Sequence, residues 1–228
     1  IVENEINKIK NFSNKNEDFQ KGKKFEKLLK MGLKVEDIIC NKSPTSASIK
    51  KIFDEFEKKF LEYFNKKIIN PDESIYTLSE TPSLLKANSL TRSLSTKLGQ
   101  VWEDIAFLSP KVINTEKIFN NLKITGVDLI IIGDKEFNFC QIKTKKDTLT
   151  GSQVKRSVNE LEIYEKKMFV AALDLSRWTF NSSKVPRVAG KDFWDLIDID
   201  YDEILKNIKN LLTSMEDYLK IDNINGVN

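Results

Sequence analysis

The residues from Thr125 to Gln153 read TGVDLIIIGDKEFNFCQIKTKKDTLTGSQ, and this stretch decides the fold. The apolar, β-branched run 126–132 predicts one strand, and the run 137–144 predicts a second. The residues 133–136 between them are Gly, Asp, Lys and Glu, which suit a tight connection. The stretch therefore predicts a β-hairpin in the core of the protein.

Three polar side chains lie at one end of this hairpin. They are Asp128, near the start of the first strand, and Gln141 and Lys143, near the end of the second. Gln141 and Lys143 share one face because successive strand side chains alternate. A four-residue loop would pair Ile132 with Phe137, so that Asp128 falls opposite Gln141. The hairpin then gathers a carboxylate, an amide oxygen and an ammonium group.

This set of side chains has two interpretations. Hydrolysis of a phosphodiester needs oxygen ligands for Mg²⁺ and a positive group near the attacked phosphate, and the three residues supply both. The alternative is an ion pair between Asp128 and Lys143 at a strand edge, beside a solvated Gln141. The three residues alone favour neither interpretation.

The spacing of these residues resembles a known signature. Asp128, twelve intervening residues and then Gln141-Ile142-Lys143 look like the bipartite motif of PD-(D/E)XK nucleases, especially type II restriction endonucleases. Gln141 replaces the usual second acid, a variant that resembles some restriction enzymes and the Mrr-like branch. The resemblance implies that Asp128 and Gln141 bind Mg²⁺, with Mn²⁺ as a substitute, and that Lys143 is catalytic. An amide oxygen binds a hard cation more weakly than a carboxylate does.

A further carboxylate is suggested by the segment LGQVWEDIAF at 98–107, which has helical spacing. It resembles the helix that many restriction endonucleases place before the catalytic strands, with a glutamate directed toward the metal. By that resemblance Glu103, more than Asp104, is a catalytic and metal-binding residue that offsets the charge missing at Gln141. The alternative is an ordinary exposed helical glutamate.

Candidate DNA contacts follow the hairpin. A basic loop at 144–151 leads into a helix expected over 152–166, and helix N-termini bind phosphate well. This run resembles the DNA-backbone-contacting segment of the nuclease family. The stretches 83–97 and 181–187 also suit phosphate or base-edge contacts, although a polar helix face or a surface loop explains them equally well. The predicted DNA-binding residues are Lys145, Lys146, Thr148, Ser152, Gln153, Lys155, Arg156, Arg92, Lys184 and Arg187.

An apolar strand expected over 168–175 completes the order strand, strand, helix, strand, which the nuclease core requires. A Gly-x-x-Phe-Trp segment at 190–194 resembles the tail of several type II restriction endonucleases, and we interpret it as an aromatic plug in the core. We expect an α/β (α+β) fold with a mixed central β-sheet flanked by helices and a restriction-endonuclease-like core. This core should comprise residues 96–228, ending in an amphipathic helix at 201–220.

We expect residues 1–95 to form a helical N-terminal region that serves packing, dimerisation and DNA contacts. This region and the core should together form one compact domain. Its helical spacing is interrupted near Gly22 and Gly32. The helix expected over 47–64 carries phenylalanines at intervals of three and four residues. This face must be buried against the core, which we favour, or against another subunit.

Composition excludes several chemistries. The chain has no histidine, which removes Ser-His-Asp and Cys-His catalysis and histidine-metal motifs. A formal net charge of +3 permits DNA binding without indicating it. Cys40 and Cys140 fit no metal-ligand spacing, so we expect free thiols in a reducing cytosol.

No apolar run is long enough to span a membrane and no cleavable signal is visible. The chain begins at Ile1 rather than Met, which suggests a missing N-terminal piece.

The sequence therefore predicts a cytoplasmic, Mg²⁺-dependent type II restriction endonuclease that cuts double-stranded DNA and leaves 5′-phosphates. A homodimer is expected because a palindrome presents one site twice. A cognate DNA methyltransferase acting on the same sequence would be its partner in the cell. The alternatives are a repair, recombination or structure-selective nuclease of the same superfamily, and a DNA-binding protein whose catalytic site has decayed.

Overall fold

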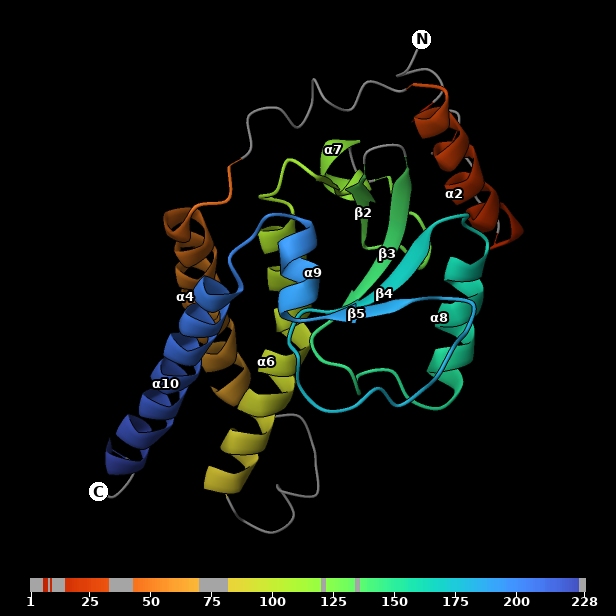
Figure 1. Ribbon diagram of the computed structural model, residues 1–228. Helices are drawn as coiled ribbons and strands as arrows, with labels where there is room; N and C mark the ends of the chain where they lie inside the picture. Colours follow the sequence, from red (N-terminus) through yellow and green to blue (C-terminus); the bar gives the residue numbers. More distant parts are fainter. Residues whose placement is uncertain are drawn as a thin grey trace. The chain divides into compact units, whose positions relative to one another are not determined.

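The chain divides into two compact units, a sheet unit of residues 1–44 and 102–199 and a helical unit of 45–101 and 200–228. This grouping differs from the division at 95/96 suggested by the sequence, and the roles expected for residues 1–95 stay predictions. The computed structural model (Figure 1) describes residues 6, 7, 9, 15–32, 43–69, 82–119, 122–133 and 136–225.

The sheet unit contains a five-stranded mixed sheet in the order β1-β2-β3-β4-β5. The first three strands form an antiparallel meander, whereas β4 runs parallel to β3, and β5 parallel to β4. Helix α8 connects β3 to β4, so the predicted order strand, strand, helix, strand is found. The α+β class and the mixed sheet flanked by helices are confirmed. The elements are β1 (Val112–Ile113), β2 (Leu129–Ile132), β3 (Phe137–Lys143), α8 (Ser152–Glu162), β4 (Lys167–Ala171) and β5 (Arg187–Ala189).

The predicted hairpin register is confirmed at the turn, where Ile132 pairs with Phe137. Asp134 and Lys135 of the connection lie outside the described residues. The first strand begins at Leu129, not at Gly126 as expected. Gly126 has φ +75°, and a Cβ added there would lie 2.5 Å from Cβ of Glu160 in α8. The chain therefore turns tightly against α8 and enters the sheet only after Asp128.

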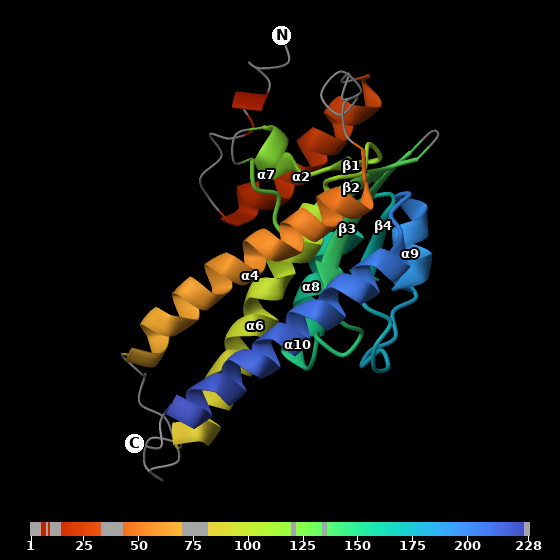
Figure 2. The ribbon, with the colours of Figure 1, turned by 90° about the vertical axis from the view of Figure 1, so that its left-hand side faces the viewer.

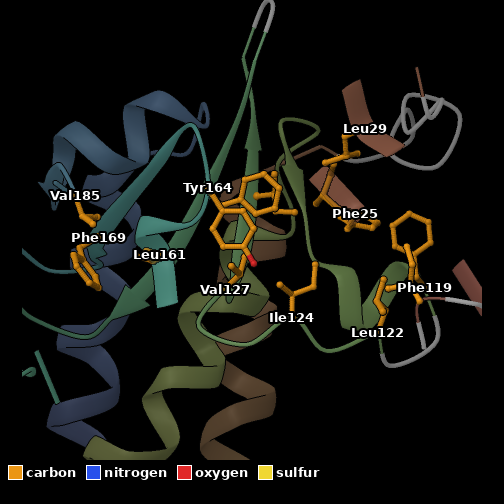
Figure 3. Close-up of a cluster of buried hydrophobic side chains, with 14 of the residues drawn as sticks. Phe25, Leu29, Phe119, Leu122, Ile124, Val127, Leu161, Tyr164, Phe169 and Val185 are labelled. Carbon is orange, nitrogen blue, oxygen red and sulfur yellow. The ribbon is translucent and has the colours of Figure 1, made fainter. Parts of the chain in front are cut away.

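A buried cluster holds α8 and the N-terminal helix α2 (Lys15–Lys30) in the sheet unit (Figure 3). The rings of Phe139 on β3 and Tyr164 are stacked with centroids 4.1 Å apart. The interruption predicted near Gly22 is wrong, because α2 continues through this residue. Glycine is needed there for packing, since an added Cβ would lie 1.8 Å from the Tyr164 hydroxyl oxygen. At Gly32, which has φ +86°, the described helix has ended in a turn.

Helix α9 (Lys191–Leu196) carries the predicted aromatic plug, and Figure 1 shows it and α8 on different sides of the sheet. Phe193 and Trp194 are fully buried, and Trp194 Nε1 donates to the Ala172 carbonyl oxygen at 2.7 Å. The apolar strand β4 ends at Ala171, earlier than expected. Residues 172 and 173 instead donate backbone hydrogen bonds to the carbonyls of Lys143 and Thr144, at 2.8 and 3.0 Å.

The helical unit contains α4 (Ser46–Ile69), residues 82–101 of α6 (Pro82–Ala106) and α10 (Tyr201–Asn225), as Figure 2 shows. Helix α4 packs against α10, and Phe60 and Phe64 are buried, with ring centroids 5.9 Å apart. The chain itself therefore buries these rings, as the favoured interpretation required. Helix α6 begins at Pro82 rather than at Leu98, so the polar stretch 83–97 is helical. Among the described residues, no helix has the length and apolar character to cross a membrane.

Candidate active site

Asp128 is fixed at the open end of the β2–β3 pair. Its backbone N–H donates to the Cys140 carbonyl oxygen at 2.9 Å, and its Oδ2 accepts from the Ile142 backbone N–H at 2.8 Å. Nζ of Lys143 lies 3.9 Å from the same carboxylate oxygen. The side chains of Asp128 and Lys143 are 28% and 26% exposed, so both reach solvent. The carboxylate is therefore held in place and remains accessible.

Gln141 lies on β3 between Cys140 and Ile142, the two residues whose backbones bond Asp128. It is 7% exposed, and its Oε1 is buried without a hydrogen-bond partner among the described residues. Leaving a buried acceptor unsatisfied costs about 1–3 kcal/mol. A solvated Gln141, which was part of the alternative interpretation, is wrong. The Asp128–Lys143 ion pair of that interpretation is present, but it is long.

Glu103, on the part of α6 that belongs to the sheet unit, is electrostatically coupled to Asp128. Burial, followed by repulsion from Asp128 and Glu116, raises the pKa of Glu103 to about 7. Burial also raises the pKa of Asp128, although the charge of Lys143 and the Ile142 N–H oppose that rise. The neighbouring Trp102 anchors this helix end, since its Nε1 donates to Thr144 Oγ1 at 3.1 Å. The predicted carboxylate therefore lies near Asp128.

A divalent cation suits the chemistry of these oxygens. Mg²⁺ takes oxygen ligands and keeps several waters, so it does not require a complete protein cage. Among the described residues, no three His, Cys, Asp or Glu side chains gather closely enough to hold a metal ion. The set Asp128, Glu103 and Gln141 contains only two acids, and its third oxygen is the unpartnered amide. That orphaned oxygen fits a cation, because a metal–oxygen contact would satisfy it.

The sequence did not reveal a second group of charges around the site. Glu116 raises the pKa values of both Glu103 and Asp128, and Lys123 opposes the rise at Asp128. Glu116 lies on α7 (Thr115–Ile118), a helix of four residues within the stretch 111–124 that was interpreted as a connector. A single turn of helix is too short to show a periodic pattern. The charges alone would have been the only available signal.

The loop after β3 holds its basic side chains in ion pairs. Lys145 Nζ lies 3.2 Å from Asp147 Oδ1, and Lys146 pairs with Asp174. The Thr148 hydroxyl donates to the Lys145 carbonyl oxygen at 2.8 Å, which closes the loop. DNA phosphates would therefore have to compete with these carboxylates for the two lysines.

The start of α8 presents a more open polar surface. Its N-cap is Gly151, with φ 54°, so no side chain at this position bonds to the first backbone N–H groups of the helix. Arg156 is paired with Glu160 at 2.7 Å, whereas Lys155 makes no ion pair with any described residue. The exposed residues predicted to contact DNA here are Ser152, Gln153, Lys155 and Arg156.

The remaining predicted DNA contacts are scattered. Lys184 pairs with Glu162 at 2.6 Å. Arg187 is the first residue of β5, not part of a loop as expected, and its guanidinium lies 5.4 Å from the centre of the Trp178 ring. Arg92 is exposed on α6 in the helical unit. Lys184 and Arg187 belong to the sheet unit, unlike Arg92, and the contacts of all three with DNA stay predictions.

Cysteine chemistry does not contribute to the site. Cys140 is buried as a free thiol, and burial raises its pKa far above the ordinary value. A thiol in this state is unreactive. Cys40 lies outside the described residues. The expectation of a buried free thiol is therefore confirmed for Cys140.

No family model, curated protein or solved structure matches the chain. Function is therefore inferred from the contacts of Asp128, Gln141, Lys143 and Glu103 and from the order of the strands around them.

Proposed function

We propose that this protein is a metal-dependent DNA endonuclease of the PD-(D/E)XK superfamily, and specifically a type II restriction endonuclease. One observation carries the proposal. The buried Oε1 of Gln141 lacks a hydrogen-bond partner among the described residues, and Gln141 lies between the two residues that fix Asp128. The ammonium group of Lys143 is 3.9 Å from the Asp128 carboxylate. These observations support a cation site beside a phosphate-stabilising group at one end of the β2–β3 pair.

The order of elements around this site supports the same proposal. A helix bearing Glu103 precedes three antiparallel strands, and α8 then leads to β4, which is parallel to β3. This is the order expected of a restriction-endonuclease-like core. Asp128 and Lys143 lie at the end of the hairpin away from its turn, next to the loop that leads toward α8.

In the proposed mechanism Asp128, Gln141 and Glu103 would hold Mg²⁺, for which Mn²⁺ could substitute. The ion, when bound, polarises a phosphoryl oxygen and acidifies water. Lys143 stabilises the negative charge that develops on the attacked phosphate, or orients the attacking water. In-line attack by water forms a new phosphorus–oxygen bond and breaks the bond to the 3′ oxygen, which takes up a proton from solvent, so the products are a 5′-phosphate and a 3′-hydroxyl.

The electrostatics of the two carboxylates support a cationic ligand. Burial, and then the charge of Asp128, raise the pKa of Glu103 to about 7, so an ionised Glu103 is repelled by an ionised Asp128. A bound divalent cation would relieve that repulsion and favour both ionised forms.

The biological unit that follows from this proposal is a homodimer on duplex DNA, because cutting both strands of a palindrome requires two copies of one site. The phosphate-binding surface would include the exposed N-terminal turn of α8 and the basic loop before it. A methyltransferase that modifies the same sequence would protect the host DNA.

A plasmid digest tests the proposal. Incubation with Mg²⁺ should give discrete bands, and end mapping should find 5′-phosphates at a fixed sequence. The Asp128→Ala and Lys143→Ala variants should bind duplex DNA but not cut it. Lys111→Ala is a matched control, because Lys111 forms a surface ion pair with Asp198 at 2.7 Å, and this variant should cut normally.

Three other outcomes would contradict the proposal in different ways. Cleavage confined to junctions or flaps would identify a structure-selective nuclease of the same superfamily. No cleavage of any DNA substrate with Mg²⁺ or Mn²⁺, together with retained duplex binding, would indicate a DNA-binding protein with a decayed site. Full activity of the Asp128→Ala variant would refute the assignment of the site itself.

A further inference from the structure

The backbone of Asp128 lies just beyond the point where the edge strand β1 ends. Strand β1 has only two residues, and Ile113 pairs with Ile130 on β2. If β1 continued in this register, Thr115 would lie opposite Asp128. The chain instead turns at Asn114 and begins α7. The carbonyl of Asp128 therefore needs a hydrogen-bond donor other than a strand backbone.

The side chain of Asn114 supplies that donor. Its Nδ2 donates to the Asp128 carbonyl oxygen at 3.5 Å, and its Oδ1 accepts from the Lys117 backbone N–H at 3.1 Å. Asn114 is buried, with 3% of its surface exposed. One amide group thus caps α7 and continues the sheet edge past the end of β1. Together with the bonds to Cys140 and Ile142, it fixes Asp128 through its N–H, its C=O and its carboxylate.

Helix α7 also extends this contact toward Glu103. The ammonium group of Lys117 is paired with Asp104 and lies 4.9 Å from the centre of the Phe107 ring. Asp104 is adjacent to Glu103 in α6. A continuous series of contacts therefore runs from the Asp128 carbonyl through Asn114 and Lys117 to the residue next to Glu103.

We propose that Asn114 is a positioning residue that sets the Asp128 carboxylate relative to Glu103. This inference rests on the proposed function for its consequence, a site that can bind a divalent cation. It does not make Asn114 a ligand, because both ends of its side chain are already engaged. Loss of the amide donor should free the Asp128 carbonyl and loosen the carboxylate, while the sheet and the helices remain.

Two substitutions separate positioning from helix capping. Asn114→Ser keeps a good, neutral N-cap for α7, but its hydroxyl is too short to reach the Asp128 carbonyl. Asn114→Ala loses both contacts. Asp200→Ala is a matched control, since Asp200 caps α10 by accepting from the Asp202 N–H at 2.8 Å and lies in the helical unit.

Mn²⁺ binding by calorimetry, hydrogen exchange of the Ile142 amide and the thermal midpoint should be measured for each variant. Loss of an outer contact at a metal site typically weakens metal binding by about 10-fold to 100-fold, and we expect that loss equally for Asn114→Ser and Asn114→Ala. Both variants should also lose protection of the Ile142 amide. All three variants should lower the thermal midpoint, Asp200→Ala by about 2–4 °C, and Asn114→Ala by more than Asn114→Ser, which keeps the helix cap.

The two readouts distinguish failure of this inference from failure of the proposed function. Wild-type Mn²⁺ affinity and Ile142 protection in Asn114→Ser would overturn the positioning role. If the wild-type protein binds no Mn²⁺ while Asn114→Ser still loses Ile142 protection, the positioning role stands and the proposed function fails. Equal loss of Ile142 protection in Asp200→Ala would also overturn the inference, because the effect would then be general destabilisation.

Discussion

The indole of Trp102 donates a hydrogen bond to the hydroxyl of Thr144 at 3.1 Å, and this contact joins α6 to the residue after Lys143. Trp102 is fully buried and immediately precedes Glu103. The bond therefore fixes the helix end that carries Glu103 against the strand end that carries Lys143. Two segments of the candidate site that are distant in the sequence are held by one hydrogen bond between the buried Trp102 and the half-buried Thr144.

Thr144→Val tests this pair. Valine keeps the shape of threonine but removes the hydroxyl that accepts from the Trp102 N–H, so we expect the free energy of unfolding to fall by about 1–3 kcal/mol. Urea denaturation measures the loss. Thr91→Val is the matched control, because the Thr91 hydroxyl is exposed and bonds only within α6. Equal stability of Thr144→Val and the wild type would show that the bond does not anchor α6.

Replacement of Gln141 by leucine should separate stability from function. An apolar side chain of similar size removes the unpartnered oxygen, so the metal-free protein should be more stable by about 1 kcal/mol. The same change should abolish stabilisation by Mg²⁺, because a ligand is lost. Denaturation curves with and without Mg²⁺ measure both effects. A Gln141→Leu protein that is less stable yet still stabilised by Mg²⁺ would contradict the role given to this residue.

The pH dependence of stability should reveal Glu103. Its pKa is raised from an ordinary 4.5 to about 7 in the folded protein, so the folded state binds a proton more tightly than the unfolded chain does. This contribution to stability is fully present below pH 4.5 and is lost as the pH rises through 7. The shift corresponds to at most about 3 kcal/mol, and to less where solvent reaches the carboxyl group.

The measurement is the free energy of unfolding between pH 5 and 8 without divalent cations. Glu103→Gln should flatten the decline, whereas Glu62→Gln, on the exposed side of α4, should keep the wild-type slope. Added Mg²⁺ should reduce the decline as well, since it favours the ionised carboxylate. A Glu103→Gln protein with the wild-type slope would mean that another group titrates.

Gly126 and Gly32 form a natural pair for testing the tight turn before Asp128. Both have positive φ, +75° and +86°, but an added Cβ meets Glu160 at 2.5 Å only at Gly126 and nothing within 4 Å at Gly32. Gly32→Ala should cost about 1–2 kcal/mol for the backbone conformation alone. Gly126→Ala should cost clearly more, because α8 must also move. Equal losses in urea denaturation would show that the turn does not pack tightly on α8.

The sequence predicted the parts of the fold that depend on local patterns. The hairpin register followed from the turn residues between Ile132 and Phe137, and the burial of Phe193 and Trp194 followed from their aromatic character. The sequence predicted a helix only from Leu98, whereas α6 begins at Pro82. Buried leucines at positions 90, 94 and 98 nevertheless make one continuous helix.

The candidate site was predictable only where its residues lie on long elements. Asp128, Gln141 and Lys143 could be grouped because strand alternation and register are local rules. The roles of Asn114, Glu116 and Lys123 could not be found, because a two-residue strand and a four-residue helix carry no periodic signal. Their positions depend on tertiary contacts that form only when β1 ends and α7 turns toward α6.

Cleavage of supercoiled plasmid by the wild type and by Asp128→Asn, in Mg²⁺ and in EDTA, is the decisive comparison. Asparagine retains an oxygen that can accept from the Ile142 N–H but removes the negative charge, so the variant should fold normally. We predict discrete linear fragments from the wild type in Mg²⁺ and intact plasmid in the other three reactions. Fragments from Asp128→Asn in Mg²⁺, or intact plasmid in all four reactions, would contradict a metal-dependent endonuclease site at Asp128.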